Sequence, residues 1–294
     1  MTPGAGLVDI EKALLASSMW QTPFQLRHNL AGNPLVTRDA LVRLTSERPP
    51  FSIAHGRSDQ AVVFERPGVD PPCTAVRAVA DLENSRSWIT LSFVDHAPGY
   101  GDLLDAVSTE FRSVLATHDG PVRARTGTVF LTSPGGVVPA HVDRHHNILL
   151  QIEGTKELCV GEFDDDLVQE QEIHRHFEGH DYLLRLPNRF QTFTLGPGQG
   201  VYIPPYRPHW IVCDQNVSIG LSCSVRTNTS HRVELAHTFN SKLRRFGLRP
   251  GVPGVRCRLD AAKAVTVTAG REVKHARHIV ASHLRKDPLP SSDT

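Results

Sequence analysis

The stretch Pro139-Ala-His-Val-Asp-Arg-His-His-Asn147 carries the densest chemical signal in this 294-residue chain. His141 and Asp143 stand two positions apart, so in an extended segment both side chains project from the same face. An imidazole nitrogen and a carboxylate oxygen can then reach one ion. Two histidines and one carboxylate form the facial triad that leaves open positions on non-haem Fe(II), and this stretch supplies two of the three ligands.

The third ligand must come from elsewhere, and His209 in Tyr202-Ile-Pro-Pro-Tyr-Arg-Pro-His-Trp210 is the best candidate. In a β-barrel a strand can return beside an earlier one at this separation. The competing interpretation is an ordinary surface pair of His141 and Asp143. The presence of His209 in a strand-like segment favours the metal site over that pair.

Lys156 follows the predicted turn Glu153-Gly-Thr155 and begins the next predicted strand. A buried lysine is costly unless it is paired, and a dicarboxylate co-substrate would supply the pairing while its other end chelates iron. The alternative is a solvated lysine at the end of a hairpin.

Short β-like runs separated by Gly, Pro, Asn and Asp follow one another as far as residue 225, and they predict an antiparallel sandwich or barrel. These runs are 127–133, 147–152, 156–161, 191–195, 200–203, 209–213 and 217–225. Before them the pattern predicts a helix over 37–44 capped by Thr37, a strand over 87–94 and a helix over 101–116.

Taken together, Pro139-Ala-His-x-Asp-x3-Asn147-x3-Gln151-Ile-x-Gly-x-Lys156 and Tyr202-Ile-Pro-x4-His209 resemble the cupin-like JmjC-domain oxygenases, which use Fe(II) and 2-oxoglutarate. The pattern is similar to that of the asparaginyl hydroxylase acting on hypoxia-inducible factor, and it extends from about residue 127 to 225. The resemblance implies a mainly β fold with flanking helices, a double-stranded β-helix of the cupin/JmjC jelly-roll type. It also implies Fe(II), 2-oxoglutarate as co-substrate, and O2.

The resemblance further implies roles for individual residues. His141, Asp143 and His209 would bind the iron and serve catalysis, and Lys156 would pair with the distal carboxylate of 2-oxoglutarate, with Asn147 nearby. The hydroxylase has a threonine where this chain has Val138, so a second hydroxyl partner must come from elsewhere. Thr128 and Thr132 share one strand face, and Ser222 and Ser224 share another. The sequence does not decide between the two pairs, and Thr128 is the candidate hydroxyl.

The implied activity is hydroxylation of an unactivated C–H bond, with a peptide or protein side chain as the expected substrate. Retention of Asp143 favours hydroxylation over halogenation, because halogenation needs that ligand position vacated for halide. The alternatives are a small-molecule tailoring hydroxylase and a non-catalytic cupin that regulates by binding a ligand. Lys156 argues against the binder, because a binder has no need of 2-oxoglutarate.

Three regions are expected: a mixed α/β region over 1–120 that packs on the barrel, the catalytic barrel over 121–225, and a basic helical region over 226–294. The last region holds 14 of the Lys and Arg residues and only five acidic ones. A helix over 231–245, ended by Gly247 and Pro250, carries an apolar stripe that suggests a homodimer through residues 231–246. The stripe consists of Leu235, Phe239, Leu243 and Phe246.

Several polar segments have two interpretations each. His145 and His146 are expected to line the mouth of the barrel or to face solvent. The acidic run 162–172, followed by His174, His176 and His180, is expected to be a solvated loop, or else a rim that attracts a basic substrate.

Composition excludes other classes of protein. With 39% hydrophobic and 21% charged residues, the chain is neither disordered nor fibrous, and no apolar run is long enough to predict a membrane span. A net charge of +1 gives no reason to expect nucleic-acid binding. The five cysteines lack a CxxC pair and the N-terminus lacks the pattern of a signal peptide, so reduced thiols and a cytoplasmic location are expected.

Overall fold

The protein is described by a computed structural model that covers residues 7–49, 52–56, 60–62 and 72–284. Side chains are described for the same residues except 72–73 and 273–284. Cys73 therefore lies outside the described side chains. Among the described helices, none is long and apolar enough to cross a membrane.

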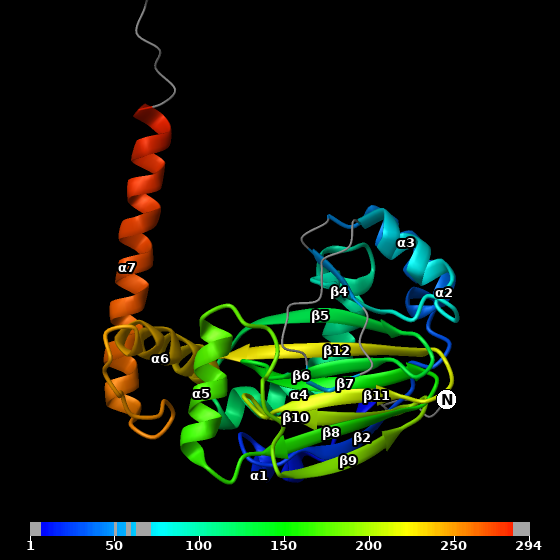
Figure 1. The fold of residues 1–294 in the computed structure, drawn as a ribbon, viewed down its shortest axis with the longest axis horizontal. Helices are drawn as coiled ribbons and strands as arrows, with labels where there is room; N and C mark the ends of the chain where they lie inside the picture. The colour runs from blue at the N-terminus through cyan, green and yellow to red at the C-terminus, as the bar shows by residue number, and fades with distance from the viewer. Residues whose placement is uncertain (1–6, 50–51, 57–59, 63–71, 285–294) are drawn as a thin grey trace, which may run out of the picture. The chain divides into compact units, whose positions relative to one another are not determined.

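Eight consecutive strands form the barrel (Figure 1). They are β5 (Val122–Thr132), β6 (Val137–His141), β7 (His146–Glu153), β8 (Lys156–Glu162), β9 (Arg189–Leu195), β10 (Gln199–Ile203), β11 (His209–Cys213) and β12 (Ser218–Thr227). Every β-run expected from the sequence is present in this series. The strands belong to two antiparallel sheets, one of eight strands in the order β1-β2-β10-β7-β12-β5-β4-β3 and one of four in the order β6-β11-β8-β9.

The barrel interior is filled from both sheets, mainly by aliphatic side chains. Leu149 and Val201 from the larger sheet belong to the same buried cluster as Leu158 and Ile211 from the smaller one. Strand β7 lies at the centre of the larger sheet and is buried along almost its whole length, because its other face is covered as well. A strand covered on both faces has an almost continuous apolar run, which explains the sequence Ile148–Ile152.

The N-terminal elements extend the larger sheet and cover its outer face. They are β1 (Val8–Asp9), α1 (Lys12–Ser18), β2 (Phe24–His28), η1 (Pro34–Val36), α2 (Arg38–Glu47), β3 (Ile53–Gly56), α3 (Pro72–Ala80), β4 (Trp88–Ser92), η3 (Val94–His96) and α4 (Tyr100–His118). Helix α2 begins where the sequence predicts, with the Thr37 hydroxyl accepting a hydrogen bond from Ala40 N. Strands β2 and β4 are hydrogen-bonded to β10 and β5 respectively, so the N-terminal region shares its sheet with the barrel.

Helix α4 packs its buried residues against the outer face of the larger sheet at close range. An added Cβ at Gly127 in β5 would lie 2.4 Å from a Leu104 methyl carbon and 2.8 Å from one of Val94. The absence of a side chain at this position therefore allows the helix to approach the sheet.

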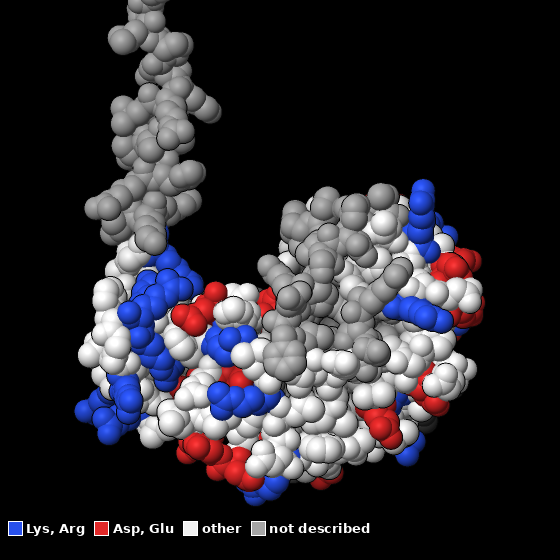
Figure 2. Space-filling view, in the orientation of Figure 1, with Lys and Arg blue, Asp and Glu red and all other residues white. Residues whose placement is uncertain are grey.

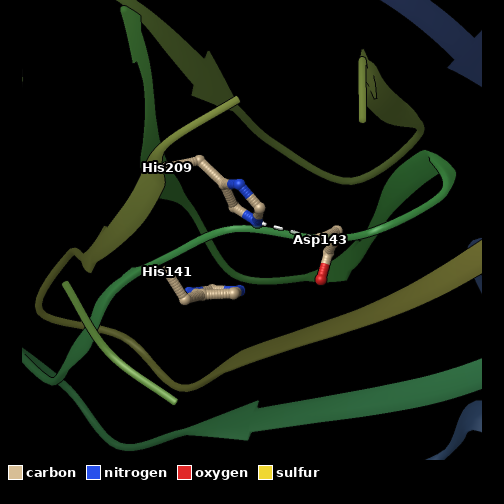
Figure 3. A group of neighbouring side chains, drawn as sticks. All are labelled: His141, Asp143 and His209. Atoms are coloured by element: carbon tan, nitrogen blue, oxygen red, sulfur yellow. Dashed lines mark ion pairs between the residues drawn. The ribbon is translucent and has the colours of Figure 1, made fainter. Parts of the chain in front are cut away.

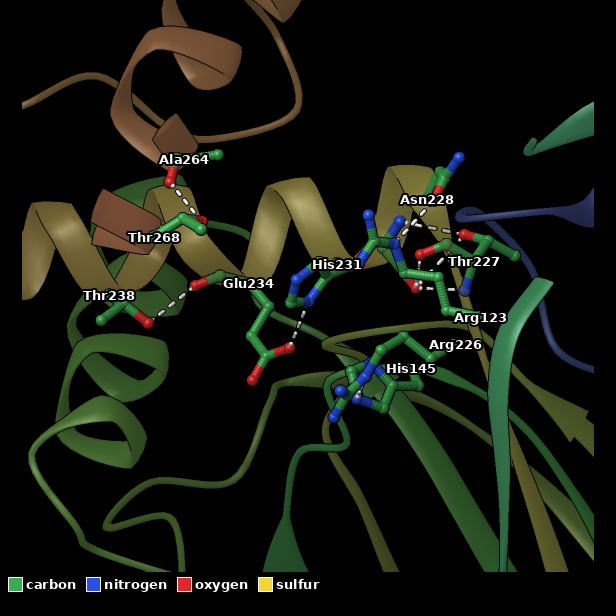
Figure 4. A network of polar contacts seen from close by, with 11 residues as sticks. Arg123, His145, Arg226, Thr227, Asn228, His231, Glu234, Thr238, Ala264 and Thr268 are labelled. Carbon is green, nitrogen blue, oxygen red and sulfur yellow. Dashed lines mark hydrogen bonds and ion pairs between the residues drawn. The ribbon is translucent and has the colours of Figure 1, made fainter. Parts of the chain in front are cut away.

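The chain divides into two compact units, one ending at Ser230 and one beginning at His231. The second unit contains most of α6 (Asn228–Arg244) and all of α7 (Cys257–Leu284). Thr227 and Ser230 cap the start of α6 by exchanging backbone-to-hydroxyl hydrogen bonds of 2.9 and 3.0 Å, as part of the polar network in Figure 4. Within the second unit, Leu235 of α6 is buried against Ala264 and Val267 of α7.

The expectation that the acidic run 162–172 forms a solvated loop is wrong. Most of it lies in α5 (Asp166–Phe177), whose first turn is capped by Asp165 accepting from Leu167 N. Glu172 is 2% exposed, accepts a hydrogen bond from Leu184 N, and lies within 3.8 Å of two arginine side chains. Carboxylates with these partners can be buried, whereas the sequence pattern alone suggested that they were solvated.

Candidate metal centre

His141 and His209 are brought together by the pairing of β6 with β11. The two residues are opposite one another in the register, and deeper in the barrel Val138 is opposite Ile211. Along β6, His141 comes three positions after Val138, whereas along β11 Ile211 comes only two positions after His209. Strand β6 therefore contains one extra residue, which forms a β-bulge. The bulge keeps His141 on the face that His209 shares, at the end of both strands.

Asp143 follows two residues after His141 and completes the cluster. One ligand atom from each of His141, Asp143 and His209 lies within 4.8 Å of the others (Figure 3). His209 Nε2 is 3.6 Å from Asp143 Oδ2, and the two imidazole centroids are 4.2 Å apart. Two nitrogens and one carboxylate oxygen on one side of a common point fit a divalent transition metal with open positions.

The hydrogen bonds of the two histidines leave the other ring nitrogen of each available. Nδ1 of His141 lies 2.9 Å from the Pro139 carbonyl oxygen, and Nδ1 of His209 lies 2.9 Å from that of Arg207. A carbonyl only accepts, so each Nδ1 carries the proton and each Nε2 presents its lone pair. Histidines that bind metals are typically oriented in this way, by an acceptor at the ring nitrogen that does not face the ion.

Asp143 is held by a short chain of hydrogen bonds. Asn147 Nδ2 donates to Asp143 Oδ2 at 2.8 Å, and Ser222 Oγ donates to Asn147 Oδ1 at 2.6 Å. Ser222 is opposite Thr128 in the register of β12 and β5, so both hydroxyls lie on one face of the sheet. Of the hydroxyls that the sequence left open, Ser222 is thus the one linked to Asp143 through Asn147.

Electrostatics keep the ligands in their binding-competent forms. Burial, with the nearby His141, lowers the pKa of His209 to about 4, so its imidazole is neutral. Burial acts to raise the pKa of Asp143, but His209 and His141 outweigh it and leave that pKa below its usual value. A neutral imidazole and an ionised carboxylate are the forms that bind metal.

Lys156 is inside the barrel, which excludes the solvated hairpin lysine. Its side chain is 2% exposed, and burial lowers the pKa of the ammonium to about 8, offset in part by the nearby Cys213. Within the described part of the chain, no carboxylate is paired with it. Lys156 therefore offers an uncompensated buried cation in the same barrel as the triad.

Two residues without a role assigned from the sequence shape the surroundings of Lys156. The Gln151 amide nitrogen donates to the carbonyls of Glu153 and Gly154 and to Ser218 Oγ, which fixes the amide orientation. Its oxygen is buried and has no hydrogen-bond partner among the residues that the structure describes. An added Cβ at Gly220 would lie 2.8 Å from Lys156 Nζ and 3.5 Å from Gln151 Oε1, so the lysine occupies space that only a glycine leaves free.

The rim of the site contains one of the histidines that follow the acidic run 162–172. His176 at the end of α5 accepts a hydrogen bond of 2.8 Å from Arg144 Nε, and the Arg144 guanidinium lies 4.8 Å from the centre of the Phe177 ring. Burial is the main cause that lowers the pKa of His176 to about 4, with Asp143 and His141 both close enough to influence it. Helix α5 thus brings a neutral histidine beside the triad.

His145 and His146 have different positions. His145 is half-buried and accepts from Arg226 Nε at 3.0 Å (Figure 4). The expectation that His146 lines the mouth or faces solvent is wrong, because it is fully buried between Asp119 Oδ2 at 3.0 Å and the Tyr202 hydroxyl at 2.8 Å. Alternation along β7 turns it to the face opposite Asn147.

Residues 112–233 match the model of the JmjC domain family. The match confirms the resemblance to JmjC-domain Fe(II)- and 2-oxoglutarate-dependent oxygenases drawn from the triad and Lys156. It also confirms the fold class, a mainly β double-stranded β-helix with flanking helices.

Solved structures with a similar fold include two of YcfD, a ribosomal oxygenase from Escherichia coli. The complex with cobalt and 2-oxoglutarate is 17% identical with a TM-score of 0.52, over 86% of this chain and 62% of that one. A second YcfD structure is 18% identical with a TM-score of 0.53, over 90% of this chain and 68% of that one. The chain therefore spans about two thirds of the length of these proteins. A comparison with curated proteins found no match.

Proposed function

We propose that the protein is an Fe(II)- and 2-oxoglutarate-dependent oxygenase that hydroxylates an unactivated C–H bond on a peptide or protein side chain. The observation that carries this proposal is the combination of an open facial triad with the unpaired, buried Lys156 in one barrel. A cupin that only binds metal needs the triad, but it gains nothing from a desolvated cation.

The protein groups have separable roles in this reaction. His141, Asp143 and His209 would hold the iron, and the facial arrangement of the three would leave the opposite side of the site accessible to 2-oxoglutarate and O2. When bound, Fe(II) supplies the redox chemistry that couples oxidative decarboxylation of 2-oxoglutarate to hydroxylation. Asn147 and Ser222 keep the Asp143 carboxylate oriented through the hydrogen bonds described above.

Lys156 selects the co-substrate by charge. Desolvation makes the bare ammonium costly, so a carboxylate that reaches it relieves the cost as well as adding attraction. Thr128, on the face shared with Ser222, is the proposed hydroxyl partner of 2-oxoglutarate.

A peptide or protein substrate is supported by the fold likeness to YcfD, which is described as a ribosomal oxygenase. We further propose a cytoplasmic location, in keeping with the unpaired thiols of Cys159, Cys213 and Cys223. A homodimer through residues 231–246 remains a proposal. Helix α7 already covers Leu235, which leaves Leu243 as the partly exposed member of the stripe that a second chain would cover.

The test of the proposed function is succinate release with Fe(II), 2-oxoglutarate and ascorbate, followed by mass spectrometry of candidate peptides for a gain of one oxygen. The Asp143→Ala variant removes the only anionic ligand and should lose both turnover and metal. Succinate release that persists in Asp143→Ala would contradict the triad. Oxygen transfer to small molecules but to no peptide would move the proposal to a tailoring hydroxylase.

A further inference from the structure

The net charge of +1 conceals a strong separation of charge along the chain. Residues 231–272 contain nine Lys and Arg but only three acidic residues. Two of these acids are buried: Glu234 is 6% exposed and Asp260 is 1% exposed. Within the described residues of this C-terminal unit, Glu272 is therefore the one exposed acid.

Five exposed cations cluster within 17 residues of sequence, at the end of α6, in the following loop and at the start of α7. We call them the basic surface: Lys242, Arg245, Arg249, Arg256 and Arg258. Figure 2 shows Lys and Arg gathered over this part of the molecule. Like charges at this density repel one another, and an anionic partner would relieve that repulsion.

The loop that carries the basic surface is held by hydrogen bonds to both helices. Gly247 ends α6 in the left-handed conformation, with φ of 77°. Asn240 Nδ2 donates to the Gly251 carbonyl at 2.9 Å, and Gly254 N donates to Asp260 Oδ2 at 2.8 Å. These bonds explain the burial of Asp260, and they fix the backbone between the cations.

We propose that the basic surface binds the phosphate backbone of single-stranded nucleic acid. Four of its five cations are arginines, whose planar guanidinium binds phosphate through two parallel hydrogen bonds. Phe246 lies between Arg245 and Arg249 and is 82% exposed. An exposed aromatic ring among arginines is the arrangement on which unpaired bases stack.

An acidic protein is the main competing partner, and the same features argue against it. Protein interfaces set their register with charges of both signs, whereas this surface is almost entirely of one sign. Repeating phosphates match a run of arginines without any register. An anionic lipid surface would match the charge and would also accommodate Phe246, so the vesicle measurement in the third test separates lipid from nucleic acid.

The first test is fluorescence anisotropy with the full-length protein and a fluorescein-labelled 12-nucleotide single strand, as RNA and as DNA. Each neutralised phosphate contributes about −0.7 to the slope of log affinity against log salt for a single strand. Five contacts therefore give an affinity that falls about 100-fold between 50 and 200 mM salt. Lack of binding at 50 mM salt would overturn the proposal.

The second test removes three of the cations together, in Arg249→Ala/Arg256→Ala/Arg258→Ala. With two contacts left, the same change of salt should lower affinity only about sevenfold. The matched control, Arg27→Ala/Arg43→Ala/Arg77→Ala, removes the same charge from exposed positions of the first unit and should keep the wild-type slope. An equal effect of both variants would mean that net charge is measured, and would overturn the proposal.

The third test separates stacking from charge. Phe246→Ala removes no cation, so it should weaken binding about 5- to 100-fold at 50 mM salt without changing the slope. Poly-glutamate at equal charge should compete poorly with the oligonucleotide. Equal competition by poly-glutamate, or binding to anionic phosphatidylserine vesicles with none to the oligonucleotide, would assign the surface to another partner.

Discussion

Lys156 separates an oxygenase from a metal-binding cupin at the scale of one residue. Lys156→Ala should retain the metal, because no metal ligand is altered, and should lose 2-oxoglutarate. Breaking a buried ion pair costs about 3–5 kcal/mol, which corresponds to a loss of about 10² to 10³-fold or more in affinity. Anaerobic titration of the Fe(II) protein, followed by the metal-to-ligand charge-transfer band, measures this loss.

The Lys156→Arg variant provides the matched comparison and should bind with intermediate affinity. It keeps the charge, but its planar fork fits poorly in a pocket shaped for an ammonium. If Lys156→Ala binds 2-oxoglutarate within about threefold of wild type, the co-substrate cation must be sought elsewhere, first at Arg144 and Arg207.

The pH dependence of co-substrate binding follows from the same lysine. Its pKa in the free protein is lowered to about 8, and only the charged ammonium attracts a carboxylate. Affinity for 2-oxoglutarate should therefore be full below pH 8 and should fall by about tenfold per pH unit above it. Titrations from pH 6.5 to 9.5 test this, and Lys156→Arg should show no such fall. A wild-type affinity that is constant up to pH 9.5 would contradict the assignment.

Gly220 gives a prediction that concerns space alone. In Gly220→Ala the new methyl group would displace the Lys156 ammonium, which is the flexible end of a side chain, so stability should change little. Affinity for 2-oxoglutarate should fall by about tenfold or more, equivalent to about 1.4 kcal/mol. Gly270→Ala, where nothing lies within 4 Å of the added carbon, is the control and should bind as wild type does.

At the scale of elements, α5 is stabilised by Glu172, which is buried and accepts from Leu184 N. Glu172→Ala leaves that N–H without its partner and should lower the free energy of unfolding by about 1–3 kcal/mol. Glu172→Gln keeps an acceptor and should cost less. Urea denaturation measures both, with the exposed Gln171→Ala as the control, expected within about 0.5 kcal/mol of wild type. Equal values for Glu172→Ala and Gln171→Ala would show that the buried contact contributes nothing.

The elements differ in how well the sequence predicts them. Seven of the eight barrel strands were predictable as short β-rich runs bounded by turn residues, with β6 the exception, and α4 was predictable because its apolar residues recur at helical spacing. Helix α5 was not, since the burial of Glu172 depends on Leu184 N and on arginines that only the fold brings near. The His141 and Asp143 pair was predictable from local spacing, and His209 was predicted from a second, distant segment that the structure places beside them. Gly220 acquires its position beside Lys156 from a strand distant in sequence, so no local pattern indicated it, and the sequence assigned no individual role to Gln151 or His176.

At the scale of the whole molecule, the prediction concerns the oligomeric state in solution. The sequence suggests a homodimer through residues 231–246, and light scattering at micromolar concentration should then give about twice the 32.4 kDa of one chain. Leu243→Asp, which places a charge on the part of the stripe that α7 leaves partly exposed, should return the mass to that of a monomer. A wild-type mass of one chain would show that α7 alone accounts for the stripe.

The bulge in β6 has a consequence for how this site can be recognised in other chains. The extra residue sets the Pro139 carbonyl beside His141 Nδ1, so the backbone itself chooses the tautomer of the first ligand. A strand shortened by that residue would still carry the His-x-Asp spacing in its sequence. It would lack the acceptor that orients the ring, and losing such an outer partner weakens metal binding by about 10- to 100-fold. Intact ligands are therefore an incomplete signature, and the spacing just before them belongs to it.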